Sequence, residues 1–134
     1  MEPHVCQINP KGNDTRGEWV AIANGGTSSV SLTGLELTDF TQTQQHVHIY
    51  SFPPTTAGTA LQLGAGETCF VFTGAGKNEW VTGNSGRRQL LLFADRRASI
   101  WNNTGDVAYL RQATSGQFVD SLTVGSPARH PNGH

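Results

Sequence analysis

The sequence predicts an all-β fold, built as a two-layered sandwich of short strands. Short apolar or alternating runs recur along the chain, turns rich in glycine and asparagine separate them, and no long helical pattern is present. Charged residues are only 14 % of the 134 residues and 16 residues are glycines, which suits a neutral domain built on turns. A chain of this length forms one domain with a single sizeable core.

Residues 19–23 and 30–40 form the clearest pair of strands. The first is a continuous apolar run, which favours a central strand covered on both faces. The turn that follows, Asn24-Gly25-Gly26, uses residues that accept positive φ at little cost. The second run alternates between apolar and polar residues, and Gly34 interrupts it, so we expect that strand to bend there.

The rest of the chain continues this pattern. Residues 90–93 are an apolar run too short for periodicity to distinguish a strand from a helical turn. Residues 74–86 resemble a glycine-rich loop that contains Trp80. The other expected strands are residues 3–10, 46–52, 61–63, 68–73, 107–111 and 118–124.

The spacing of these strands is typical of an immunoglobulin-like β-sandwich, although the usual pattern of two cysteines and a tryptophan is absent. A small antiparallel β-barrel is the alternative. We expect one domain over residues 1–125 and a flexible C-terminal tail, rich in Pro, Asn, Gly and His, over residues 126–134.

Four short motifs follow one another along the chain. They are Glu18-Trp19-Val20-x-Ile22-x-Asn24; Leu32-x-Gly34-x-x-Leu37-x-Asp39; Phe52-Pro53 with Leu63-x-Ala65-Gly66-Glu67 and Val71-x-Thr73-Gly74; and Trp101-Asn102-Asn103-x-Gly105-Asp106 with Leu110 and Val119-Asp120-Ser121. In this order they resemble the lamin tail domain, an immunoglobulin-like family, in its prokaryotic type. Leu35 departs from the Trp or Tyr that the family often has after the glycine, and residues 74–97 follow the family pattern least well. The resemblance covers about residues 3–125 and implies a sandwich with a binding or scaffolding role, since lamin tails are surfaces for proteins and DNA.

The sequence gives only limited information on the cellular compartment. The N-terminus lacks the basic and apolar regions of a signal peptide, so we expect a cytoplasmic protein, or an extracellular one if the chain is cut from a longer secreted protein. No run approaches the roughly 20 apolar residues of a membrane helix, so we expect no membrane insertion.

The chain has two cysteines, Cys6 and Cys69. We expect both to be buried thiols, with a disulfide between them and a reactive thiol as the alternatives.

The sequence contains no catalytic motif. A nucleophile elbow, a phosphate-binding loop and a Cys–His pairing are all absent, so we expect a non-catalytic protein without a cofactor. We expect the carboxylates of Asp39, Asp106 and Asp120 to accept hydrogen bonds from backbone N–H groups in turns. His46 and His48 share one strand face, which is a weak metal-site candidate against two exposed histidines, because a third ligand is not apparent.

The strongest candidate for a binding surface is the region from Gly74 to Arg97. Two arginine pairs, Arg87-Arg88 and Arg96-Arg97, flank the apolar run at residues 90–93. They form either a basic patch that binds a partner or a set of solvated side chains at the rim of the domain. Trp19, Trp80 and Trp101 are core candidates, but Trp80 stands in a polar segment and is equally suited to contact a partner. We expect a protein partner, with nucleic acid only weakly supported by the net charge of −1 and self-association as a further alternative. The predicted binding residues are Trp80, Arg87, Arg88, Arg96 and Arg97.

Overall fold

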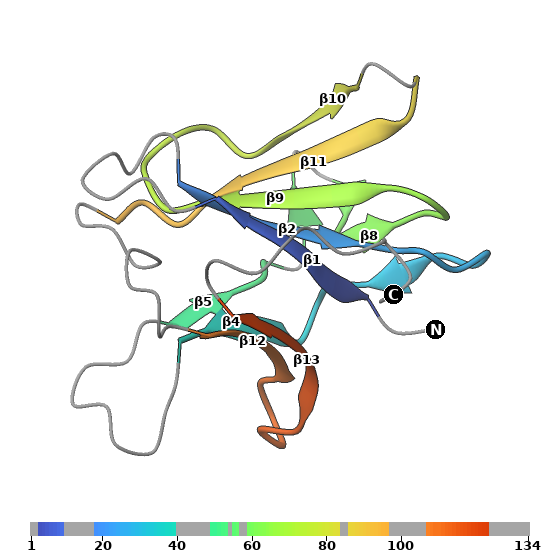
Figure 1. Ribbon diagram of the computed structural model, residues 1–134. Helices are drawn as coiled ribbons and strands as arrows, with labels where there is room; N and C mark the ends of the chain where they lie inside the picture. Colours follow the sequence, from blue (N-terminus) through green and yellow to red (C-terminus); the bar gives the residue numbers. More distant parts are fainter. Residues whose placement is uncertain are drawn as a thin grey trace.

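The computed structural model describes residues 3–9, 18–39, 49–53, 55–56, 59–83, 86–96 and 107–123, and all of its regular elements there are strands. Two sheets face each other across one core (Figure 1). None of these sheets closes into a barrel, so the predicted sandwich is confirmed and the barrel alternative is wrong. The strands are β1 (His4–Asn9), β2 (Trp19–Ala23), β3 (Val30–Ser31), β4 (Leu35–Thr38), β5 (Ile49–Ser51), β6 (Thr55–Thr56), β7 (Thr59–Ala60), β8 (Gln62–Leu63), β9 (Thr68–Phe72), β10 (Glu79–Thr82), β11 (Arg88–Phe93), β12 (Val107–Gln112) and β13 (Phe118–Thr123).

The larger sheet has five strands, in the order β1-β2-β9-β11-β10, and the facing sheet has four, in the order β13-β12-β4-β5. Strands β9 and β11 pair in parallel, whereas the other pairs are antiparallel. Short two-stranded pairs, β3-β8 and β6-β7, complete the described part. The order leaves β10 at one edge of the larger sheet, which Figure 1 shows at the top.

The core lies between the two sheets, because alternate residues of each strand point inward. Ile22 and Cys69 pair across β2 and β9, Leu90 continues the same row on β11, and Leu110 faces them from β12. Further buried residues of the cluster are Val5, Ile8, Val20, Leu32, Leu35, Leu37, Phe52, Leu61, Leu63, Val71, Leu92, Ala108 and Leu122.

Aromatic side chains cover the outer face of the five-stranded sheet. Trp19 meets Phe70 edge to face, with ring centroids 5.1 Å apart, and Phe72 stacks on Phe93 at 5.0 Å. Trp19 is therefore not part of the core cluster, which corrects the sequence expectation. Its position follows from strand alternation, since Val20 and Ile22 occupy the inward positions of β2.

The structure decides two local features, the bend at Gly34 and the conformation of residues 79–82. Gly34 has φ +86°, so the predicted strand over residues 30–40 bends there and separates into β3 and β4. Residues 79–82, predicted to lie in a loop, form β10 instead, because they pair with residues 88–91 of β11. That pairing also settles the ambiguous apolar run as a strand.

Both cysteines are free thiols, so the disulfide alternative is wrong. Cys69 is fully buried, and this burial raises the pKa of its thiol. Cys6 lies at an irregularity in the β1–β2 register, and its thiol donates to the carbonyl oxygen of Ala21 at 3.5 Å. The Cys69 thiol therefore behaves as a small apolar core group.

Polar side chains tie the two sheets together. The Asp120 carboxylate on β13 accepts a hydrogen bond from the backbone N–H of Val5 on β1 at 2.8 Å. This confirms that Asp120 binds a backbone N–H group, although the bond joins the two sheets and does not close a local turn. The Nδ1 atom of His4 also lies 3.7 Å from the Asp120 carboxylate. Asp39 is buried, whereas Asp106 lies outside the described residues. The predicted tail at 126–134 also lies outside them.

Candidate interaction surface on the edge strand

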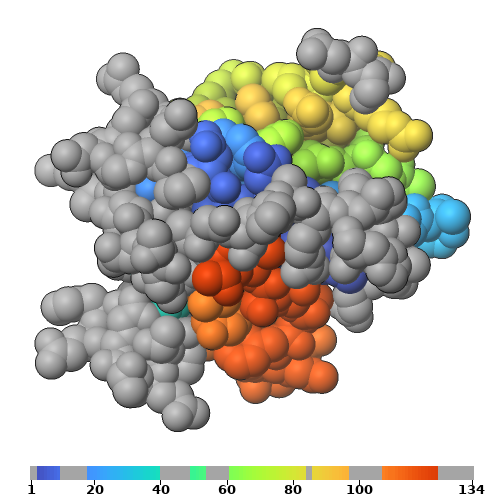
Figure 2. Space-filling model, viewed as in Figure 1, coloured from blue at the N-terminus to red at the C-terminus, as the bar shows by residue number. Residues whose placement is uncertain are grey.

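The candidate site lies where β10 and β11 meet the turn that precedes β9. Its members, which we call the Trp80–Arg88 cluster, are Glu67, Trp80, Arg87 and Arg88. Figure 2 shows this part of the larger sheet, in yellow and yellow-green, at the upper edge of the view, far from the orange-red β12–β13 hairpin. The cluster therefore lies at a corner of the sandwich.

Strand pairing brings Arg88 and Trp80 together. Thr82 pairs with Arg88, and Trp80 pairs with Leu90 two positions further along, so the indole and the guanidinium are diagonal neighbours on one face. The Arg88 Cζ atom lies 4.3 Å from the centroid of the Trp80 ring. This is a cation–π contact, which restricts the guanidinium to one plane.

Glu67 holds Arg88 from the other side. The Nε and Nη2 groups of Arg88 donate to the two carboxylate oxygens of Glu67 at 2.8 Å and 3.1 Å, a bidentate pair. Parallel pairing explains the contact, because Thr68 of β9 lies beside Gln89 of β11 and the residue before each is Glu67 or Arg88. The Arg88 side chain still keeps 53 % of its surface exposed, so a fixed guanidinium faces solvent.

Glu67 has a lowered pKa through this arrangement. Burial alone would raise the pKa of Glu67, but hydrogen bonds from Arg88 and the Gly64 N–H, and the charge of Arg88, together bring the pKa below its ordinary value. The Gly64 bond measures 2.7 Å. Glu67 therefore stays ionised, and paired with Arg88, to a lower pH than an ordinary glutamate would.

We expect Arg88→Ala to raise the pKa of Glu67, since the variant removes both hydrogen bonds from Arg88 and the charge of its guanidinium. The lowered pKa of the wild type contributes stability that is present above the ordinary glutamate pKa and is lost as the pH falls through the folded value. A ¹³C NMR titration of the Glu67 carboxyl group measures the shift directly. A titration curve identical in wild type and variant would contradict the described pairing. Arg96→Ala is the control and leaves the curve unchanged.

Arg87 takes a different position beside the same turn. Its Nη1 donates to the carbonyl oxygen of Ala65 at 3.1 Å, and its side chain is exposed. Gly66 makes this approach possible, because it has φ +75° and a Cβ there would collide with the Arg87 guanidinium. Arg87 therefore supplies a second cation next to Arg88 without a carboxylate partner of its own among the described hydrogen bonds and ion pairs.

Arg96 lies apart from this cluster. The six residues of β11 span about 17 Å, and Arg96 follows the far end of that strand. Its Nη2 donates to the carbonyl oxygen of Ile49 on β5 at 2.8 Å, so it bridges the two sheets. The structure thus brings Trp80, Arg87 and Arg88 together, and it separates Arg96 from them. Arg97, His46 and His48 lie outside the described residues.

Glu67 could not be recognised from the sequence as part of this site. The only local signal was its place at the end of the turn Gly64-Ala65-Gly66-Glu67. The Trp80 indole packs partly buried against the core, and its Nε1–H is buried with no hydrogen-bond partner in the described part of the chain. That part also contains no cluster of three or more His, Cys, Asp or Glu side chains that could hold a metal ion.

The five-stranded and four-stranded sheets that face each other form an immunoglobulin-like β-sandwich, and β10 is an open edge of the larger sheet. The Lamin Tail Domain family model matches residues 4–126, so the chain belongs to the lamin tail domain family and the resemblance seen in the sequence is confirmed. A comparison with curated proteins finds no significant match. No helix in the described ranges is long and apolar enough to cross a membrane.

Proposed function

We propose that this domain is a non-catalytic protein-interaction module that binds an extended segment of a partner protein along β10. The observation that carries the proposal is the open edge of that strand, which pairs with β11 on one side and with no other strand in the described part. Exposed strand edges present N–H and C=O groups that a further strand can pair with. The family is immunoglobulin-like, and this supports a binding role by analogy.

The backbone groups available on β10 follow from the ladder pattern. The Gly83 N–H donates to the Arg87 carbonyl at 2.8 Å, which makes this a hydrogen-bonded pair. Hydrogen-bonded pairs alternate in an antiparallel ladder, so the next ones are Val81 with Gln89 and Glu79 with Leu91. The N–H and C=O groups of Trp80 and Thr82 therefore point away from β11, toward an incoming strand.

Positive charge on β11, next to the Thr82 end of β10, favours an acidic partner segment there, whereas the exposed Glu79 lies at the other end of β10. Arg87 and Arg88 are both exposed at the start of β11, and Glu67 offsets only one of the two charges. A tryptophan beside fixed arginines is also the composition of interaction hot spots. We infer that the partner contributes an extended segment with Asp or Glu side chains facing the Trp80–Arg88 cluster.

A pull-down tests this proposal with matched arginine variants. The whole chain serves as bait in a lysate of the producing organism, at low and high salt, with and without nuclease. Arg87→Ala/Arg88→Ala should retain about tenfold less partner, because two charges that guide and hold an acidic segment are lost. Arg96→Ala is the matched control, since Arg87 and Arg96 each donate one bond to a backbone carbonyl.

The outcomes separate the alternatives. A protein retained after nuclease treatment by wild type and Arg96→Ala, but not by the double variant, supports the proposal. Equal retention by all three baits contradicts it. Retention of nucleic acid alone, lost at high salt, would instead indicate a DNA-binding accessory domain. The stability of the double variant should fall by less than about 1 kcal/mol, because the Glu67–Arg88 pair is exposed on the arginine side.

A further inference from the structure

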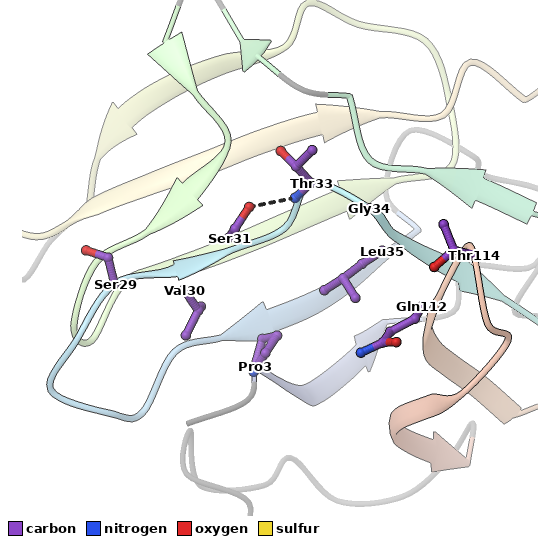
Figure 3. Close-up of a pocket in the computed structure, with 9 residues that line it drawn as sticks. All are labelled: Pro3, Ser29, Val30, Ser31, Thr33, Gly34, Leu35, Gln112 and Thr114. Atoms are coloured by element: carbon purple, nitrogen blue, oxygen red, sulfur yellow. Dashed lines mark hydrogen bonds between the residues drawn. The ribbon is translucent and has the colours of Figure 1, made fainter.

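A second site lies at the other sheet, in a pocket of about 450 Å³. Its walls are the β3–β4 bend and the turn that follows β12, and Pro3 borders it next to β1. Figure 3 shows Gln112 at the end of β12, with its side chain on the side where Pro3 lies and with Leu35 above it in the view. The volume falls in the range of about 300–1,000 Å³ that is typical of small-molecule sites.

The described residues that line this pocket are mostly polar, and none of them carries a charge. Hydroxyl groups come from Ser29, Ser31, Thr33 and Thr114, and a carboxamide comes from Gln112. Val30, Leu35 and Pro3 supply apolar surface. Each hydroxyl can donate and accept a hydrogen bond, so the lining matches a ligand whose own groups also do both. A charged ligand would lose its hydration without gaining a counter-charge.

Several of these polar groups are free to bind a ligand. The Ser31 Oγ accepts the Thr33 N–H at 3.1 Å, which leaves its O–H to donate. The Gln112 Oε1 accepts from the Ser115 Oγ at 3.0 Å, which leaves the two Nε2 hydrogens. The side chains of Ser29, Thr33 and Thr114 form no hydrogen bond to another described residue. The pocket therefore offers donors and acceptors that are not already paired.

The backbone fixes the two walls relative to each other. The Ala113 N–H donates to the Gly34 carbonyl at 2.9 Å, which joins the turn after β12 to the β3–β4 bend. Within the bend, the Leu35 N–H donates to the Leu32 carbonyl at 3.1 Å. Within the turn, the Gly116 N–H donates to the Gln112 carbonyl at 2.8 Å. A pocket held in this way loses little entropy when a ligand binds.

An exposed aromatic residue lines a second hollow that shares Gln112 with the pocket. Gln112 also lines a smaller hollow of about 140 Å³ with Gln117, Phe118 and Val119. Phe118 stacks on Tyr109 with centroids 4.8 Å apart, yet 51 % of its surface is exposed. A ring supported on one side and open on the other can pack against the C–H face of a second ligand unit.

We propose that this pocket binds a neutral saccharide, with one sugar residue among the hydroxyl groups and the next one over Gln112 against Phe118. Sugars combine several neutral hydroxyls with an apolar C–H face, which is the combination that the lining and Phe118 present. The site lies between the β3–β4 bend and the β12–β13 hairpin, whereas β10 is an edge of the five-stranded sheet (Figure 1). It therefore goes beyond the proposed function and does not depend on it.

NMR titration of the ¹⁵N-labelled whole chain tests this proposal. The probes are the methyl glycosides of glucose, galactose, mannose and N-acetylglucosamine, and the disaccharides cellobiose, maltose and lactose. We expect at least one probe to cause saturable shifts confined to the amides of residues 29–35 and 112–119, with a Kd of about 1 mM. We expect a disaccharide to bind more tightly than its methyl glycoside. No saturable shifts with any probe, or shifts elsewhere only, would overturn the proposal.

Matched variants locate the ligand. Thr114→Val should weaken binding about fivefold and Phe118→Ala about tenfold. Their controls are Thr123→Val, at the other end of β13, and Ile49→Ala, the second exposed large apolar residue in the described part and on the opposite edge of the sheet. Unchanged affinity in both pocket variants would overturn the proposal. So would tighter binding of glucuronic acid or glucose 6-phosphate, because an uncharged pocket should disfavour both.

Discussion

Replacing Asn24 by alanine should cost about 3 kcal/mol of folding stability, because three backbone groups lose their partner together. Asn24 is fully buried after β2. Its Nδ2 donates to the carbonyls of Ser28 at 2.8 Å and Leu63 at 2.9 Å, and its Oδ1 accepts the Gly26 N–H at 3.0 Å. The side chain thus closes its own turn and fastens it to β8. Urea unfolding followed by tryptophan fluorescence measures the loss.

Two further variants make this test specific to the amide. Asn24→Asp keeps an oxygen for the Gly26 N–H but turns a carboxylate oxygen toward two carbonyls, so it should be at least as damaging at neutral pH. Gln62→Ala, an exposed residue next to Leu63, should change stability by less than about 0.5 kcal/mol. A loss below about 1 kcal/mol for Asn24→Ala would show that the turn does not depend on this side chain.

Replacing Arg111 by methionine should cost about 3 kcal/mol, because it leaves the Glu36 carboxylate buried without the cation that it faces. The Nε of Arg111 lies 2.6 Å from the Glu36 Oε1, and the two side chains are only 16 % and 11 % exposed. Both residues lie in the four-stranded sheet, where β4 pairs with β12. Chemical denaturation of the single variant measures the loss.

The double variant distinguishes a charge effect from a packing effect. Glu36→Met/Arg111→Met removes both charges, and its stability should return to within about 1 kcal/mol of the wild type. Arg88→Met provides the comparison on the exposed Glu67–Arg88 pair and should cost less than about 1 kcal/mol. If the double variant is as unstable as Arg111→Met alone, lost packing rather than an unpaired charge explains the effect.

Much of the strand layout was predictable from the sequence, because strands and turns leave local signals. The apolar run at 19–23 became β2, and Gly34 marked a bend that needs positive φ. The first strand and the closing hairpin also appeared where alternation predicted them. The family resemblance was confirmed over nearly the whole chain.

The candidate site was only partly predictable, since side-chain partners depend on which strands pair. The contact between Glu67 and Arg88 exists because β9 and β11 run in parallel, and periodicity within one strand carries no information about its neighbour. The same limit hid the strand character of Trp80 and Val81, because the residues on either side of this pair are polar or glycine. It also hid the separation of Arg96 from Arg87, which the length of β11 imposes.

The saccharide pocket left no signal in the sequence. Its hydroxyl groups come from residues 29–33 and 114, which are far apart in the chain and ordinary in turns. They converge because Ala113 bonds to Gly34 across the two walls. Serine and threonine in turns usually satisfy local backbone groups, so the sequence alone gave no reason to choose them.

The central claim is that a partner adds a strand along β10, and amide exchange tests it most directly. Hydrogen–deuterium exchange of the Trp80 and Thr82 N–H groups is compared in the free chain and in the complex with the protein captured by the pull-down. Both amides point away from β11, so we expect their exchange to slow by at least about tenfold in the complex, as new ladder bonds form. Unchanged exchange of both amides in a saturated complex would show that the partner binds elsewhere and would contradict the claim.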